Sequence, residues 1–276
     1  MSAVFADAPL ARRLETTEGH GNAAFVDAQA RREPYSGAIR TEIAGTLAMF
    51  AGVGSPITQT FGLGIHAQPG DRDLDAIERF FTSRGSAVFH EVSPLAGVDL
   101  LATLVRRGYK PIEVSNVMFR EISGKSGASG ASGASGASGA SGALRVRGVE
   151  HHEADWYGGI AARGWSEMPE VLPYITGFAR SSVECATCFV AELDGQAIAT
   201  AALFMHGGVA LLAGASTVPE GRRNGAQLAL LNTRLQTAAA RGCDLAMMVA
   251  APGSASQRNA ERNGFRVAYT RTKWQL

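Results

Sequence analysis

The residues with the clearest capacity for chemistry lie at positions 216–227, where two glycines flank two adjacent arginines. The stretch reads Ser-Thr-Val-Pro-Glu-Gly-Arg-Arg-Asn-Gly-Ala-Gln. An apolar run at 209–213 precedes it and predicts a buried strand, and leucines at helical spacing follow as far as Gly242. A turn that opens a helix presents unpaired backbone N–H groups at the positive end of the helix dipole. Glycines would let that backbone approach a ligand, so the stretch predicts a cradle for a pyrophosphate.

Two nucleotide-binding motifs do not fit this stretch. It has no Lys in the turn, as the Gly-x-x-x-x-Gly-Lys-Ser/Thr P-loop requires, and no Gly-x-Gly-x-x-Gly spacing. It resembles instead the acetyl-CoA signature of the GNAT (Gcn5-related) superfamily of N-acetyltransferases, Arg/Gln-x-x-Gly-x-Gly/Ala, at residues 222–227. Gln227 departs from that signature, in which the family has Gly or Ala. A basic helix N-terminus without a ligand is the alternative interpretation of the turn.

A second group of residues strengthens the resemblance. Pro-Gly-Ser at 252–254, Asn259 and Gly-Phe at 264–265 resemble the next motif of the GNAT family. Hydrophobic periodicity over residues 144–276 predicts the order β-α-α-β-β-β-α-β-α-β, which is that of a GNAT domain. By this resemblance, the segment is identified as a catalytic GNAT acetyltransferase domain.

The resemblance implies which residues hold acetyl-CoA, the co-substrate, with no metal required. Backbone groups of Ser216 and Val218 would pair with the pantetheine arm, and an amide near Ser216 would face the thioester oxygen. The turn at 223–228 would hold the pyrophosphate. Asn259 would hydrogen-bond the CoA arm, with a place on the helix surface as its alternative. The implied cofactor-binding residues are Ser216, Thr217, Val218, Arg222, Arg223, Asn224, Gly225, Ala226, Gln227, Leu228 and Asn259.

Aminolysis of a thioester requires a neutral attacking amine and a proton for the departing thiolate. The family often places a Tyr four residues before the Gly of its Gly-Phe pair, but Ala260 occupies that position. Tyr269, the nearest downstream phenol, and Ser256, acting through a water, are the candidate catalytic residues. The alternative for Tyr269 is a strand aromatic that packs on the sheet.

A general base is not evident, because no carboxylate lies in the strand that leads to the turn. Glu167 and Glu170 lie in a loop that lines the acceptor side in this family, and His90 and Glu91 end the matching strand of the first half. Such residues are more typical of a solvated surface. An amine of low pKa would need no strong base. Aromatic residues that could shape an acceptor pocket, or simply pack in the core, are Trp156, Trp165 and Phe178.

The first half of the chain resembles the second in the spacing of its predicted elements. Its patterns predict a helix-rich start at 1–39, strands at 57–65, 88–92 and 112–122, and helices at 74–85 and 100–108. Gly85 and Gly108, which end these two helices, are spaced almost as Gly242 and Gly264 are. The spacing predicts an internal repeat of the same fold.

Electrostatics distinguish the two copies. Where the arginine turn would recur, the first half has Asp71, Asp73 and Asp75. Three carboxylates would repel a pyrophosphate, so we predict a degenerate copy that binds no CoA. The predicted fold class is α/β (α+β), with two GNAT-like domains that each contain a mixed, mostly antiparallel twisted sheet flanked by helices. The degenerate domain covers residues 1–123 and the catalytic domain residues 144–276.

Residues 124–143 contain a Ser-Gly-Ala repeat that has no side chains able to build a core. Such composition predicts a flexible linker. Whether this repeat is native or engineered stays open.

Bulk properties exclude several classes of protein. The formal net charge of +1 favours neither a nucleic acid nor a membrane as partner. No apolar run is long enough to cross a bilayer, and the first residues do not resemble a secretory signal. Three cysteines, an odd number, favour a reduced cytoplasm. Cys185 and Cys188 have the C-x-x-C spacing, but without a second pair or a nearby His we expect no metal site.

The resemblance to the GNAT family implies an acetyl-CoA-dependent N-acetyltransferase that transfers an acetyl group to an amine by direct attack on the thioester, and the cysteine content favours a cytoplasmic protein. The acceptor would be a small-molecule or peptide amine, and its identity stays open. The oligomeric state also stays open, a homodimer included. The alternatives are a non-catalytic CoA-sensing or partner-binding module, which the missing Tyr favours, and a scaffold that binds no CoA, which Gln227 favours.

Overall fold

The computed structural model describes residues 4–122, 144–169 and 171–276. The linker predicted at 124–143 therefore lies outside the described residues. Contacts group the chain into two compact units. Unit 1 contains Met1–Arg120, Met205–Leu211 and Met247–Leu276, and unit 2 contains Glu121–Phe204 and Leu212–Ala246. The predicted domains follow the order of the chain, whereas unit 1 also contains the C-terminal residues.

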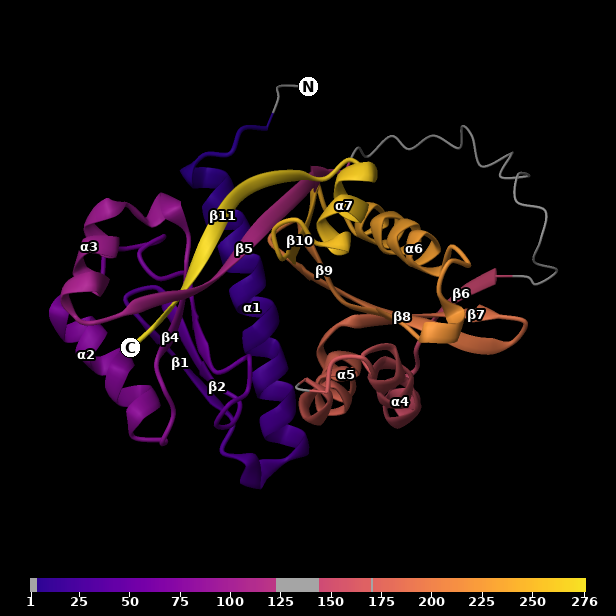
Figure 1. Ribbon diagram of the computed structural model, residues 1–276, viewed down its shortest axis with the longest axis horizontal. Coiled ribbons are helices and arrows are strands. Elements are labelled where there is room, and N and C mark those ends of the chain that lie inside the picture. Colours follow the sequence, from indigo (N-terminus) through magenta and orange to yellow (C-terminus); the bar gives the residue numbers. More distant parts are fainter. Residues whose placement is uncertain (1–3, 123–143, 170) are drawn as a thin grey trace. The chain divides into compact units, whose positions relative to one another are not determined.

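Unit 1 is built on a mostly antiparallel sheet. Its helices are α1 (Ala8–Arg32), α2 (Asp71–Thr82), α3 (Val98–Arg106) and α7 (Ala255–Arg262), and its strands are β1 (Ile39–Ile43), β2 (Thr46–Phe50), β3 (Gln59–Phe61), β4 (Phe89–Val92), β5 (Lys110–Glu121) and β11 (Arg266–Gln275). The strand order is β1-β2-β3-β4-β11-β5, and each of these pairings is antiparallel except β3 with β4. The C-terminal strand therefore lies between two strands of the N-terminal half (Figure 1).

Two apolar layers cover the two faces of this sheet. Neighbouring residues Leu47 and Ala48 of β2 belong to different layers, because successive side chains of a strand point to opposite faces. Leu47 packs in the layer of Val26 from α1. Ala48 packs in the layer of Leu74 from α2 and Leu104 from α3. Each buried aliphatic side chain of this kind stabilises the fold by about 1.5–3 kcal/mol.

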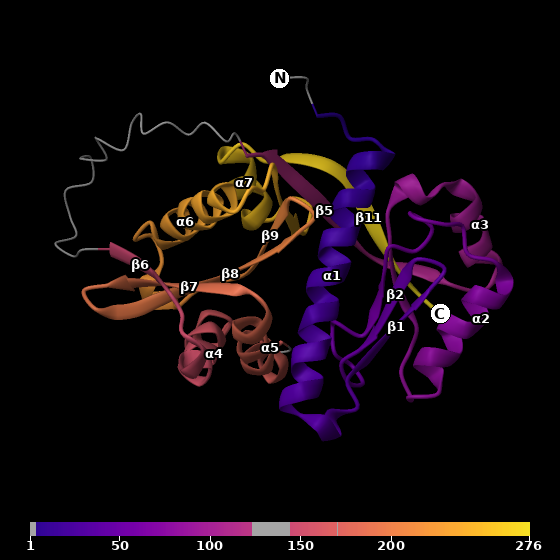
Figure 2. The ribbon, with the colours of Figure 1, turned by 180° about the vertical axis from the view of Figure 1, so that it is seen from behind.

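Unit 2 contains the turn singled out by the sequence. Its helices are α4 (Ala154–Gly164), α5 (Leu172–Cys185) and α6 (Ala226–Ala240), and its strands are β6 (Leu144–Gly148), β7 (Thr187–Leu193), β8 (Gln196–His206) and β9 (Val209–Thr217). The strand order is β9-β8-β7-β6, and β8, β9 and the following strand β10 (Leu245–Ala250) contribute residues to both units. Helix α6 lies on one side of β7 and β8, and α4 and α5 lie on the other (Figures 1 and 2). Short 3-10 helices cover Pro34–Ser36, Pro94–Ala96, His151–Glu153 and Pro219–Gly221.

The predicted fold class is confirmed in its essential part, a mixed α/β structure with a mostly antiparallel sheet flanked by helices. Strands β1 and β2 were not predicted from the sequence, and the strand predicted at 57–65 is limited to Gln59–Phe61. The elements β1-β2-β3-α2-β4-α3-β5 have the same order of types as β7-β8-β9-α6-β10-α7-β11. This order agrees with an internal repeat. That the first series is a degenerate copy stays a prediction.

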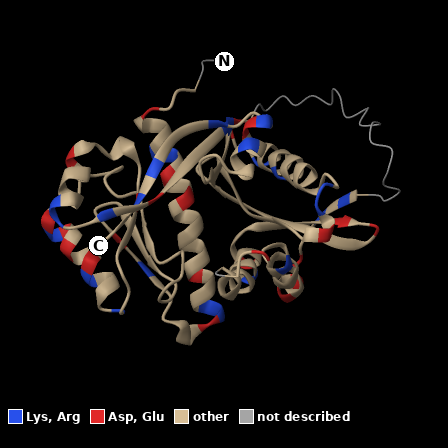
Figure 3. Cartoon of the chain, viewed as in Figure 1, with Lys and Arg blue, Asp and Glu red and all other residues tan. Residues whose placement is uncertain are grey.

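Charged residues of both signs are interspersed in each unit, in keeping with the small net charge (Figure 3). Within residues 4–122, 144–169 and 171–276, no helix combines the length and the hydropathy that a bilayer span requires.

Candidate functional site

The turn between β9 and α6 has the geometry of an open helix N-terminus. β9 ends at Thr217, and α6 begins at Ala226. Gly225 is the N-cap of α6, with a left-handed φ of 77°, and no side-chain hydrogen bond caps the helix. Because Gly has no side chain to cap the helix, the N–H groups of its first turn can donate to an anion.

The two arginines of the turn are exposed but differ in their partners. Arg222 donates to the Glu167 carboxylate at 2.7 Å, and this contact lowers the pKa of Glu167. Arg223 has a left-handed φ of 67°, uncommon for a residue other than Gly, and has no carboxylate partner among the described residues. Arg223 therefore presents a positive charge without internal competition. Glu167, a candidate base, is held in its ionised and weakly basic form.

Gly221 is required by packing, which differs from the ligand approach expected from the sequence. It is buried, and a Cβ added to it would lie 2.6 Å from the Cβ of Ile198 in β8. No real Cβ contact is that short, so any larger residue must displace the turn from the strand. The glycine thereby fixes where the arginines stand.

Gln227, the departure from the family signature, ties the start of α6 to the end of β9. Its Nε2 donates to the Ser216 carbonyl at 2.9 Å and to the Thr217 hydroxyl at 2.8 Å. Asn224 donates from Nδ2 to the carbonyl of Gly221 at 3.2 Å. Both amide side chains of the turn therefore pair inside the chain.

The end of β9 is closely packed. The Ser216 hydroxyl lies 2.8 Å from that of Thr200 in β8, and the Val218 N–H donates to the Ile198 carbonyl at 2.9 Å. Gly164, the last residue of α4, fits against Ser216 only because it lacks a Cβ, which would lie 2.5 Å from the Ser216 Oγ. Of the predicted cofactor-binding residues, Ser216, Val218 and Ala226 are buried, Thr217, Asn224 and Gln227 are half-buried, and Arg222, Arg223, Gly225, Leu228 and Asn259 are exposed.

An apolar cavity of about 200 Å³ lies within unit 2, next to the end of α4. Three of its lining residues, Tyr157, Ala161 and Trp165, come from α4 and the residue after it. The others are Ile175, Phe178, Ala179 and Ser182 of α5 and Gly214 of β9. Two of the three aromatic residues proposed for an acceptor pocket, Trp165 and Phe178, line it. The third, Trp156, stacks instead under the Arg147 guanidinium, 5.0 Å from its ring centre. Tyr157 and Ser182 were not singled out, since helical periodicity was their only signal.

The remaining predicted site residues belong to unit 1. Ser256 and Asn259 are exposed on α7. Tyr269 is buried in β11, and its hydroxyl donates to Oε1 of Glu15 at 2.8 Å. Burial, followed by the neighbouring Glu15 charge, raises the pKa of Tyr269 well above its usual range. Of the two candidate catalytic side chains, only Ser256 is exposed.

Glu15 and Tyr269 adjoin a buried ion-pair cluster centred on Arg271. Arg271 donates to both carboxylate oxygens of Glu18 at 2.6 and 2.7 Å and lies 3.0 Å from Glu91. Glu15 lies farther from Arg271, at 3.6 Å. Burial therefore outweighs this attraction and raises the pKa of Glu15 to about 7. Glu91, one of the candidate bases, is therefore ion-paired with Arg271.

His90, another candidate base, is fully buried in unit 1. Its Nδ1 lies 2.8 Å from the Thr60 hydroxyl and its Nε2 lies 2.9 Å from the Tyr109 hydroxyl. Burial lowers the pKa of His90 to about 3, so the imidazole stays neutral. Such a ring is a structural hydrogen-bonding residue. Glu170, the fourth candidate base, lies outside the described residues.

Replacing Glu15 by Gln is expected to remove part of the pH dependence of stability. The folded-state pKa of Glu15 is raised, so its protonated form stabilises the fold below about pH 4.5, and this stability is lost as pH rises through 7. Relative to wild type, the variant should gain on the order of 2 kcal/mol between pH 4.5 and 8. Chemical denaturation of both proteins across this range measures the difference in the free energy of unfolding. His90, whose lowered pKa has the opposite effect on stability, is present in both proteins, so its contribution cancels in this difference. If the free energy of unfolding changed with pH in the same way in both proteins, the expectation would be wrong.

The corresponding helix start in unit 1 is built differently. Asp73 accepts a hydrogen bond from the Gly70 N–H at 2.9 Å and so occupies the N-terminus of α2. Arg107 pairs with Asp71, Asp75 and Glu78, and the contact to Glu78 is 2.9 Å. Acidic side chains therefore surround the start of α2, whereas the corresponding start of α6 has no side-chain cap.

Comparison with known proteins agrees with this geometry. The model of the acetyltransferase (GNAT) family matches residues 150–265. No curated protein matches the chain. Among solved structures, the chain is similar to a GCN5-related N-acetyltransferase from Kribbella flavida, with a TM-score of 0.57, 19% identity, and coverage of 92% of this chain and 95% of that one.

Two further solved structures are similar over most of the chain. One is a GCN5-related N-acetyltransferase from Sphaerobacter thermophilus, with a TM-score of 0.55, 14% identity, and coverage of 98% and 92%. The other is a tandem GNAT protein from the clavulanic acid biosynthesis pathway, with a TM-score of 0.56, 14% identity, and coverage of 84% and 78%. At these identities the likeness concerns the fold. The family match alone places residues 150–265 of this chain in the acetyltransferase (GNAT) family.

Proposed function

We propose that the protein transfers an acetyl group from acetyl-CoA to an amine by direct attack on the thioester. The uncapped start of α6 beside Arg223, inside the family-matching segment, carries this proposal. The first-turn N–H groups of α6 would hold the pyrophosphate, because they combine unpaired donors with the positive end of the helix dipole. Arg223 would add a charge-assisted hydrogen bond.

The pantetheine arm would run along the end of β9, where Gln227 already occupies the Ser216 carbonyl. An arm amide that uses this carbonyl has to displace the Gln227 side chain. Gln227→Ala is therefore expected to lower KM for acetyl-CoA by about threefold, within the modest net value of one hydrogen bond. Initial rates over a range of acetyl-CoA concentrations measure this effect. A raised KM would mean that Gln227 itself holds the cofactor.

We assign the apolar cavity of unit 2 to the acceptor. Its aromatic and aliphatic walls favour an amine attached to an apolar body. None of the described residues that line it carries a carboxylate or an imidazole, and Glu167 is held ionised by Arg222. An acceptor whose amine is already neutral near pH 7 would need no general base. The proposed acceptor class is thus apolar amines of low pKa. Ser256 and Tyr269 stay predictions for the proton donor, and the exposed Ser256 is the more accessible of them.

The decisive experiment combines binding with turnover. Calorimetry with acetyl-CoA is expected to show binding, and thiol release at pH 7 should be faster with aniline than with benzylamine, which is of similar size but protonated. The benzylamine rate should rise by about tenfold per pH unit while its neutral fraction grows. Binding without thiol release across amines and peptides would favour the non-catalytic module. No binding would favour the scaffold.

The setting of the reaction is also part of the proposal. None of Cys185, Cys188 and Cys243 forms a disulfide bond in the described part of the chain, which suits a reducing cytoplasm. The acceptor would be a small molecule or a peptide amine. A homodimer stays a prediction that analytical ultracentrifugation checks.

A further inference from the structure

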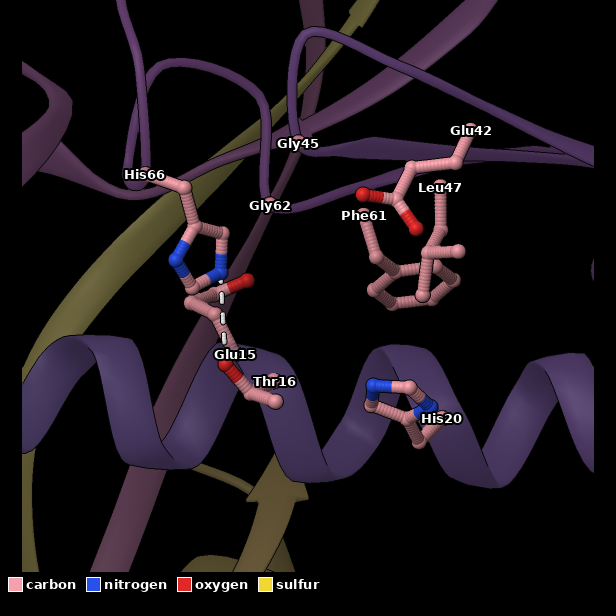
Figure 4. Close-up of a pocket in the computed structure, with 9 residues that line it drawn as sticks. All are labelled: Glu15, Thr16, His20, Glu42, Gly45, Leu47, Phe61, Gly62 and His66. Atoms are coloured by element: carbon pink, nitrogen blue, oxygen red, sulfur yellow. Dashed lines mark hydrogen bonds between the residues drawn. The ribbon is translucent and has the colours of Figure 1, made fainter.

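A second cavity, of about 240 Å³, lies entirely within unit 1. Its lining comes from α1, from the β1–β2 hairpin, and from β3 with the loop that follows it. The nine residues that line it are Glu15, Thr16, His20, Glu42, Gly45, Leu47, Phe61, Gly62 and His66. In Figure 4, Glu42 from β1 and His20 from α1 reach toward the same space from opposite sides. The proposed acetyl transfer uses none of these residues.

The polar part of the lining provides hydrogen-bond acceptors. Burial lowers the pKa values of His20 and His66, so both rings are neutral near pH 7 and each has an unprotonated nitrogen. One nitrogen of His66 lies 3.2 Å from the Thr16 hydroxyl. Glu42 is exposed and has no ion-pair partner in the part of the chain that the structure describes. These groups suit a ligand that brings N–H donors.

The charge of the cavity is negative. None of the described residues that line it is a Lys or an Arg. Arg40, which lies near His20 and Glu42, is paired with Asp27 at 2.9 Å, and Arg12 donates to the Ile65 carbonyl at 3.1 Å. The nearby cations are therefore engaged elsewhere. The Glu42 carboxylate faces the cavity without a counter-ion from the described chain, which favours a cationic ligand.

The non-polar part of the lining gives the ligand a hydrocarbon portion. Leu47 and Phe61 form a wall that belongs to the apolar layer against α1. Gly45, at a φ of 73°, keeps the hairpin close to His66, since a Cβ there would lie 3.0 Å from that of His66. The space between this wall and the polar groups fits a short chain that ends in a charged head.

We infer that this cavity is a binding site for a small organic ammonium ion, whose N–H groups donate to the Glu42 carboxylate and to the imidazole nitrogens of His20 and His66, and whose hydrocarbon part packs on Leu47 and Phe61. The ligand needs both a positive charge and N–H donors, so neither a neutral alcohol nor a carboxylate of the same chain length should bind. The site belongs to unit 1 and does not depend on acetyl transfer. Its equivalent in the second series of elements is the apolar cavity, so the two copies would recognise different chemistry.

Histidine NMR tests this inference on the full chain without acetyl-CoA. The protein, labelled at the histidine Cε1 positions, is titrated at pH 7.5 with n-butylammonium, and in parallel with 1-butanol and with butyrate. Butylammonium should shift the signals of His20 and His66, assigned by their loss in His20→Asn and His66→Asn. The signals of His151 and His152 in unit 2 should not move and serve as internal controls.

A matched pair of variants locates the charge. Glu42→Gln should weaken butylammonium binding by about tenfold, because Glu42 is the only exposed carboxylate among the described residues that line the cavity. Asp99→Asn, an equal change at an exposed position of α3, should leave it unaltered. Equal shifts with 1-butanol or butyrate, an absence of shifts, or unchanged binding in Glu42→Gln would each overturn the inference. These outcomes leave the acetyltransferase proposal untouched, since cofactor binding and thiol release are measured separately.

Discussion

Replacing Arg223 by Glu is expected to raise KM for acetyl-CoA by about 100-fold, with little change in kcat. The side chain stands at the uncapped start of α6 and has no carboxylate partner among the described residues. Reversal of its charge removes one charge-assisted hydrogen bond to the pyrophosphate and adds repulsion. The pyrophosphate is remote from the thioester, so ground state and transition state lose the same stabilisation.

Two variants serve as controls for this effect. Arg223→Gln removes the charge without reversing it and should raise KM by about tenfold. Arg241→Glu makes the same reversal at the C-terminal end of α6 and should change KM by less than about twofold. Initial rates and calorimetry measure the three proteins. An unaltered affinity in Arg223→Glu would place the pyrophosphate elsewhere.

Gly164→Ala is expected to destabilise the protein by about 2–3 kcal/mol and to impair acetyl-CoA binding. The new methyl group would lie 2.5 Å from Oγ and 2.7 Å from Cβ of Ser216, so either α4 or the end of β9 must move. The end of β9 is held by the Thr200 and Gln227 side chains, which makes the displacement costly. Thermal or chemical unfolding measures the loss, and calorimetry measures the binding.

The same helix offers a matched control. Gly159 lies in α4, is exposed, and has nothing within 4 Å of an added Cβ. Gly159→Ala should therefore stabilise the protein by up to about 1 kcal/mol, as the helix propensity of Ala predicts. In the double variant Gly164→Ala with Ser216→Gly, both clashing atoms are removed and part of the stability should return. A Gly164→Ala protein as stable as Gly159→Ala would mean that the α4–β9 contact is loose.

The two cavities lie at corresponding places in the two series of elements. Each lies between the helical segment before a series of strands and the third strand of that series. One lining is apolar and aromatic, and the other presents two carboxyl groups and two imidazoles. If both proposals hold, one copy of the fold would bind an amine for acetylation and the other would bind a small ammonium ion.

The start of α2 differs from the start of α6 in its charged residues. Asp73 occupies the N-terminus of α2, and Arg107 forms ion pairs with Asp71 and Asp75. The acidic pattern was visible in the sequence, and we still expect it to disfavour a pyrophosphate. Its pairing with Arg107 was not visible, because that residue comes from the end of α3.

The sequence by itself determined the features that depend on near neighbours along the chain. The amphipathic period of α2, the strand of β7 and the turn before α6 follow from local spacing. The resemblance that indicated the family of residues 150–265 also rests on short motifs of neighbouring residues. Only the tertiary structure decided that β11 lies between β4 and β5, since strand pairing depends on contacts between distant residues.

The same distinction applies to the sites. Tyr269 is a phenol near the right motif in the sequence, but the structure pairs it with Glu15, more than 200 positions away. His20, Glu42 and His66 carry no motif, and β1, β3 and α1 must fold together before they share a cavity. Local periodicity describes which face of an element is apolar. It contains no information on which distant side chains meet, because burial and charge compensation arise only when the elements pack.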